Sequence, residues 1–112
     1  MKRDEELQAE LDRMVALASR DPSVERVMVF GSMAGGGAWR SGVGEESDLD
    51  LCIVQHTDER FLDRLASWID RLAPRVAVDL LVYTPAEWAD LSRTNPFVRE
   101  EILAKGRAVH AA

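Results

Sequence analysis

The sequence is poor in cysteine, has no long apolar run and carries too few basic residues to balance its acids. Cys52 is the only cysteine among 112 residues, so no disulfide can form within the chain. A lone thiol is typical of a reducing compartment, and we expect a cytoplasmic protein. No apolar run approaches the ~20 residues that a membrane-spanning helix needs. The opening Met1-Lys2-Arg3 leads into acidic residues, which is not typical of a secretory signal.

The charge balance argues against a nucleic-acid-binding surface. Acidic residues outnumber basic residues by 20 to 14, which gives a net charge of −6 at pH 7. Proteins that bind long nucleic acids present basic residues to the phosphates, and this chain has no run of lysine or arginine. We therefore expect no direct binding to a long nucleic acid. With 46% hydrophobic and 30% charged residues, the composition is that of an ordinary globular protein, and the length predicts a single domain over 1–112.

Glycine is scarce outside one stretch, because six of the seven glycines lie between Gly31 and Gly44. The segments on either side of this stretch have regular apolar patterns. Apolar residues spaced by three and four predict helices, whereas β-branched runs predict strands. The predicted helices cover 5–19 and 61–72, and the predicted strands cover 24–30, 49–54 and 76–83.

Two start signals predict further helices near the end of the chain. Thr84-Pro85-Ala86-Glu87 has the pattern of a capping box with proline at the first helical position. Asn95-Pro96 begins a last helix that continues through Lys105 and is closed by Gly106, before a short strand over 107–110. Strands that alternate with helices predict an α/β or α+β fold, with a small mixed sheet of three or four strands flanked by helices.

Two acids stand two residues apart at the start of the second predicted strand. Side chains alternate along a strand, so Asp48 and Asp50 would share one face while Leu49 and Leu51 turn into the core. Two like charges on one face call for a positive partner, and Mg²⁺ takes carboxylate oxygens together with substrate phosphates. We therefore predict a metal site here. The competing interpretation is a solvated surface, since acid-x-acid pairs also occur elsewhere in this acidic chain.

A third acid and a glycine extend this candidate site. Asp79 lies inside an apolar run, where a carboxylate is costly to bury unless it is paired or metal-bound. It is either a third ligand, an acid at the exposed end of an edge strand, or a partner of Arg75. Gly31-Ser32 stands where a strand turns into a predicted helix, so the backbone could approach a phosphate closely. A plain strand-to-helix turn is the alternative.

Three motifs in this order resemble the DNA polymerase β-like nucleotidyltransferase superfamily: Phe30-Gly31-Ser32-x-Ala34-x-Gly36, Ser47-Asp48-x-Asp50-Leu51 and Val78-Asp79-Leu80. The short chain is similar to the minimal nucleotidyltransferases of that superfamily. The resemblance implies transfer of a nucleoside monophosphate, AMP from ATP, to a hydroxyl acceptor. It also implies the residues that hold the nucleotide, Gly31, Ser32 and Ser47, and those that bind Mg²⁺, Asp48, Asp50 and Asp79. Asp79 would in addition help to deprotonate the acceptor.

The resemblance also implies a partner. Minimal nucleotidyltransferases often pair with helical HEPN proteins, and several act as antitoxins that add AMP to a tyrosine of the HEPN toxin. A homo- or hetero-oligomer is compatible with this role. The chain departs from the family pattern at Met33 and Gly35, where the family often has arginine, and in a longer 37–46 loop. Positive charge for the triphosphate would then come from Arg40, Arg75 or Lys105, or would be missing.

These departures keep two other functions open. The first is a catalytically weak or inactive module that neutralises a partner by contact. The second is transfer to a small molecule such as an antibiotic, although so short a chain has little room for a substrate domain. Among the remaining residues, Cys52 shares the predicted strand face of Asp50 but is most simply a small buried residue. Trp68 and Trp88 are predicted core residues, and Trp39 in the glycine-rich segment either stacks on a base, contacts a partner or anchors the loop.

Overall fold

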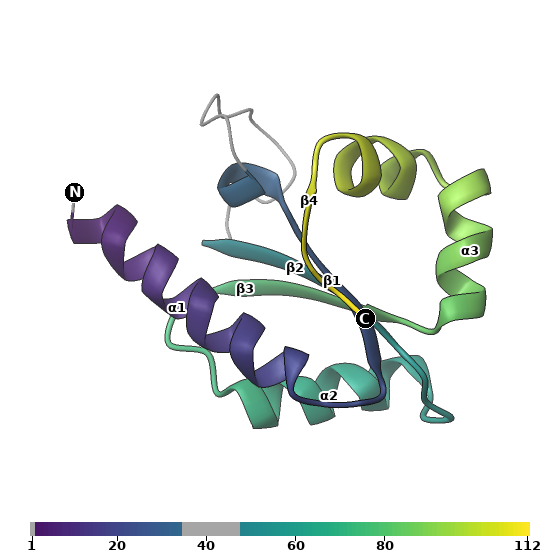
Figure 1. Cartoon of the computed structure of the whole chain (residues 1–112), viewed down its shortest axis with the longest axis horizontal. Helices are drawn as coiled ribbons and strands as arrows, with labels where there is room; N and C mark the ends of the chain where they lie inside the picture. The colour runs from purple at the N-terminus through teal and green to yellow at the C-terminus, as the bar shows by residue number, and fades with distance from the viewer. Residues whose placement is uncertain (1, 35–47) are drawn as a thin grey trace.

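Four strands form one mixed sheet in the order β3-β2-β1-β4, in a computed structural model that describes residues 2–34 and 48–112 (Figure 1). The elements are α1 (Lys2–Ser19), β1 (Val24–Phe30), the 3₁₀ helix η1 (Gly31–Ala34), β2 (Leu49–Gln55), α2 (Phe61–Leu72), β3 (Val78–Tyr83), α3 (Pro85–Thr94), the π-helix η2 (Val98–Ala104) and β4 (Arg107–Ala111). Strand β1 is antiparallel to both β2 and β4, whereas β3 is parallel to β2. The predicted fold class is confirmed. Within the described ranges, no helix is long and apolar enough to cross a membrane.

Helices cover both faces of the sheet, with α1 and α2 on one face and α3 and η2 on the other (Figure 1). Each face has its own apolar layer. The first layer packs α1 and α2 against the sheet through Leu11, Met14, Ala18, Val24, Val27, Val29, Leu49, Leu51, Ile53, Trp68, Leu72, Leu80 and Val82. The second packs α3 and η2 through Met28, Phe30, Cys52, Val54, Trp88, Val98 and Ile102. Strand β2 lies between the two layers, so all of its residues are buried.

Most of the predicted boundaries are confirmed, because local signals set them. Strand β1 and helix α2 have the predicted ends, and the capping box of α3 is present: the Glu87 amide donates to Thr84 Oγ1 at 3.2 Å, and the Thr84 amide donates to Glu87 Oε1 at 2.9 Å. Strand β3 is shorter than predicted. It begins at Val78 instead of Val76, and the Ala77 carbonyl before it accepts from the amides of both Asp48 and Leu49. The last helix is present but is largely a π-helix.

Polar side chains fasten α2 to the sheet at the end away from η1. The indole N–H of the buried Trp68 donates to Gln55 Oε1 at 2.9 Å, and Gln55 Nε2 donates to Ser23 Oγ at 3.0 Å. The buried Arg64 donates to the carbonyl of Val82 at 3.2 Å and to Glu87 Oε1 at 2.7 Å. These contacts fix the helices on the far end of the sheet and leave the end at Gly31 to the candidate site.

Candidate active site

The end of β1 brings Gly31 against a carboxylate. Strand β1 stops at Phe30, which lies opposite Asp50 of β2 in the antiparallel register, and Gly31 follows with φ +70°. A Cβ atom on Gly31 would collide with Oδ2 of Asp50. Glycine is therefore required here twice, for its positive φ and for the close approach of the Asp50 side chain. The sequence suggested that Gly31 makes room for a phosphate, and the structure shows that it makes room for a carboxylate.

Asp50 is the most deeply buried carboxylate of the described residues, with 1% of its surface exposed. It shares the α3 and η2 face with Cys52, whereas Leu49 and Leu51 face α1 and α2, as the alternation predicted. The burial of Cys52 as a small core residue is also confirmed, and burial raises the pKa of its thiol to about 12. A buried carboxylate is costly unless positive charge or hydrogen-bond donors compensate it. A carboxylate is rarely this deeply buried, and such a position is typical of a functional group.

Asp79 lies beside Asp50 on the neighbouring strand. The parallel ladder between β2 and β3 places the two residues directly opposite each other, so their side chains start from the same face of the sheet. Asp79 is exposed, because β3 is an edge strand. Arg75 lies against Glu10 instead, and the described residues include no ion pair between Arg75 and Asp79. The salt-bridge interpretation of Asp79 is wrong, and its place on an edge strand is confirmed.

The carboxylate of Asp48 contacts the backbone of the segment before β3. Asp48 precedes β2, and its backbone N–H donates to the carbonyl of Ala77 at 2.9 Å. Its carboxylate in turn accepts the Ala77 amide at 3.1 Å, which joins the start of β2 to the segment before β3. Within residues 2–34 and 48–112, no three His, Cys, Asp or Glu side chains form a group that could hold a metal ion. The fold thus brings Asp50 and Asp79 to the same level and holds Asp48 at the adjoining strand start.

Several predicted site residues fall partly or wholly outside the described residues. Ser47, Trp39 and Arg40 lie in the 35–47 segment, and of Ser32 only the backbone, within η1, is described. The other two residues predicted to supply positive charge to the triphosphate lie close to acids. Lys105 contacts Glu101 at 3.1 Å, and the Arg75 guanidinium lies 4.0 Å from Glu10.

A buried glutamate braces the segment that leads into β3. Glu10 accepts two hydrogen bonds from Arg13, at 2.9 and 2.7 Å, and one from the backbone N–H of Arg75 at 2.7 Å. The bonds from Arg13 are the main reason why the pKa of Glu10 falls from its usual value near 4.5 to about 2. Arg13 also donates to the carbonyl of Leu72 at 2.8 Å. Helix α1 thereby holds the chain that carries Asp79 into its register beside Asp50.

One basic residue near the site was missed by the sequence reasoning. Arg107, the first residue of β4, donates from Nη2 to the carbonyl of Met33 in η1 at 3.3 Å. The two residues are 74 positions apart, and no local pattern indicates such a contact. Figure 1 shows how the contact arises, because η1 and the start of β4 lie next to each other at the same end of the sheet.

Comparison with known proteins gives a match to a family model that covers most of the chain. The family model described as Polymerase beta, Nucleotidyltransferase matches residues 12–111, a range that includes Gly31, Asp48, Asp50 and Asp79. No curated protein and no solved structure gives a match.

Proposed function

Because the chain belongs to the polymerase β nucleotidyltransferase family, we propose that it transfers AMP from ATP to a hydroxyl acceptor and releases pyrophosphate. The observation that carries this proposal is the buried carboxylate of Asp50, seated against Gly31 and level with Asp79 on the next strand. A structural role would not need a carboxylate at this buried position. A deeply buried carboxylate beside a second acid is an arrangement that catalytic sites often use.

The chemistry of the three acids suits a hard divalent cation, although within residues 2–34 and 48–112 their side chains are not gathered into a metal-binding group. Asp48, Asp50 and Asp79 offer carboxylate oxygens, which Mg²⁺ prefers, from the starts of two adjacent strands. Bound there, Mg²⁺ would supply charge that stabilises the attacking and leaving oxygens of an in-line displacement. Gly31, Ser32 and Ser47 would hold the phosphates. The bond that forms joins the acceptor oxygen to the α-phosphorus, and the bond that breaks releases pyrophosphate.

Asp79 is the residue we assign to the acceptor. A general base must reach the hydroxyl proton that it removes. Asp79 is exposed on an edge strand, whereas Asp50 is buried, so only Asp79 of this pair is open to an incoming hydroxyl group. We propose that Asp79 accepts the proton as the acceptor oxygen attacks.

We propose further that the acceptor is a tyrosine of a HEPN toxin and that the chain acts as its antitoxin in the cytoplasm. This acceptor is the one implied by the similarity to minimal nucleotidyltransferases. The second candidate is a module that neutralises its partner by contact alone. The bond between the Asp48 carboxylate and the Ala77 amide favours it, because that carboxylate already has a structural role.

The fate of labelled ATP separates the two candidates. The protein is incubated with Mg²⁺, the product of the adjacent gene and ATP labelled at either the α- or the γ-phosphate. Nucleotidyl transfer places the α-label on the partner and releases the γ-label as pyrophosphate. Asp48→Asn is the test variant, because asparagine can still accept the Ala77 amide but lacks the charge. Asp63→Asn, at an exposed position of α2, is the control.

The expected result is α-label on the partner with the wild type and the control, and strong loss with Asp48→Asn. A tight complex that carries no α-label in any sample would refute the enzymatic proposal and support neutralisation by contact. Label that persists unchanged in Asp48→Asn would remove Asp48 from the metal site.

A further inference from the structure

The contact between Arg107 and η1 links the C-terminal strand to the candidate site. We propose that Arg107 is a positioning residue that holds the η1 turn in place against Asp50, and that it thereby sets the affinity for the nucleotide. The second half of this inference rests on the proposed nucleotidyl transfer. The first half concerns only the placement of the turn and can be tested without it.

Gly106 brings Arg107 to the right place. A Cβ atom on Gly106 would collide with the carbonyl oxygen of Ile102 and would lie 2.9 Å from the carbonyl oxygen of Val29. The junction between η2 and β4 is therefore pressed onto β1 near its end. The register then places Arg107 opposite Val29, two residues before Gly31. The base of the Arg107 side chain is thus fixed beside the point where β1 becomes η1.

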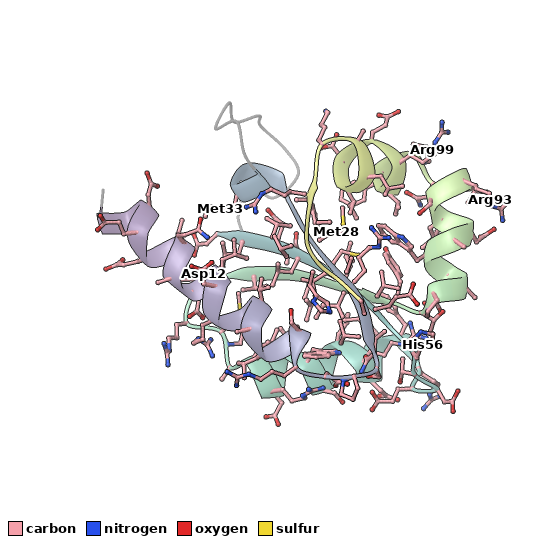
Figure 2. The ribbon with its side chains drawn as sticks, in the orientation of Figure 1. Asp12, Met28, Met33, His56, Arg93 and Arg99 are labelled. Carbon is pink, nitrogen blue, oxygen red and sulfur yellow. The ribbon has the colours of Figure 1, made fainter. Side chains whose placement is uncertain are left out.

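From this position the guanidinium donates to the Met33 carbonyl at 3.3 Å. The Met33 side chain packs against the first apolar layer, and Figure 2 shows it on η1 near α1. The turn has only four residues, so its placement depends on such outside contacts. Hydrogen bonds from a charged donor are about twice as strong as neutral ones. Arg107 and the Met33 side chain therefore hold the same residue of the turn from two directions.

Holding Met33 also holds Gly31. The two residues belong to one helical turn, and Gly31 cannot move toward β2 without meeting the Asp50 carboxylate. Release of the Met33 carbonyl would let η1 move only away from Asp50, which would widen the space between the proposed phosphate-holding turn and the proposed metal ligand. Small displacements of positioned groups have large effects on binding and rate. We expect this one to weaken nucleotide binding.

The test compares Arg107→Met, Arg107→Lys and the control Arg99→Met. Arg99 is an exposed arginine that points outward from η2 (Figure 2). The first measurement is amide chemical shift and hydrogen exchange at Gly31 and Met33 by NMR. The second is KM for ATP and kcat in the labelled-transfer assay.

Arg107→Met is expected to speed exchange at Met33 and to raise KM for ATP about tenfold, the effect of losing one hydrogen bond from a charged donor, with a smaller change in kcat. Arg107→Lys should recover part of both effects, since it keeps the charge without the fork of donors. Arg99→Met should change neither.

Unchanged exchange and shifts at Gly31 and Met33 in Arg107→Met would overturn the positioning role, whether or not the wild type transfers AMP. Altered exchange together with an unchanged KM would overturn its link to the nucleotide. Absence of transfer by the wild type would instead refute the proposed function, and the NMR result would still decide whether Arg107 holds the turn.

Discussion

Replacing Gly31 with alanine should destabilise the protein for two separable reasons. Alanine at φ +70° costs about 1–2 kcal/mol, because its Cβ crowds the backbone in the left-handed region. The new methyl group would also collide with the Asp50 carboxylate, and forced overpacking of this kind costs about 1–3 kcal/mol. Gly31→Ala should therefore lower the free energy of unfolding by about 2–5 kcal/mol, a large part of the total for a small domain.

A double-mutant cycle separates the two costs. Asp50→Ala removes the oxygen that the methyl group would meet and leaves only the Asp50 Cβ, at 3.3 Å from the position of the new methyl group, which needs a shift of a few tenths of an ångström. In that background Gly31→Ala should cost only the conformational term, about 1–2 kcal/mol. The expected coupling between the two positions is thus about 1–3 kcal/mol.

Urea unfolding of the four proteins measures the cycle, with the midpoint and the slope m fitted separately so that a change in the unfolded state is recognised. Equal cost of Gly31→Ala in both backgrounds would show that Asp50 does not press on Gly31. A cost below about 1 kcal/mol in the wild-type background would contradict both terms. Either outcome would remove the geometric basis of the candidate site.

Three further substitutions test polar contacts that hold the helices on the sheet. Glu10→Gln should make the free energy of unfolding depend less on pH in the acid range. Because the folded-state pKa of Glu10 is lowered, its stabilisation is complete above about pH 4.5 and is lost as the pH falls toward about 2. Urea unfolding from pH 2 to 7 measures the difference. Trp68→Phe leaves the buried Gln55 oxygen without its indole donor and should cost about 1–3 kcal/mol by the same method, whereas a cost near zero would mean that this bond is not stabilising. Glu87→Ala removes both the capping box and the partner of the buried Arg64. It should lower the free energy of unfolding by at least about 1 kcal/mol and lower the thermal midpoint measured by circular dichroism. An unchanged midpoint would contradict this.

The sequence predicts the elements of this fold well because short-range patterns determine them. The apolar spacing that predicts a helix over 61–72 and the Thr84 capping box are local signals, and both elements are confirmed. The alternation along β2 correctly places Asp50 on the face of Cys52. The family match covers the range that contains Gly31 and the three acids.

The contacts that shape the site could not be predicted, because they join residues far apart in the chain. No pattern around Gly31 reveals that a methyl group at this position would collide with the Asp50 side chain. The bond from the Arg75 amide to Glu10 spans 65 positions, and that from Arg107 to Met33 spans 74. Asp48 illustrates the limit in another way. Strand alternation places it with Asp50, but its carboxylate turns to the Ala77 amide, because the segment before β3 offers a donor there.

The central claim is that the buried Asp50 is kept for nucleotidyl transfer, and its charge can be removed with almost no change in shape. The direct measurement is the rate of α-label transfer from ATP in the presence of Mg²⁺ by Asp50→Asn, beside the exposed control Asp63→Asn, with both variants first shown to be folded by circular dichroism. We predict a fall of about a hundredfold or more for Asp50→Asn, comparable to the loss of one charge-stabilising group in other enzymes, and less than about twofold for the control. An Asp50→Asn variant that transfers AMP at the wild-type rate would contradict the account.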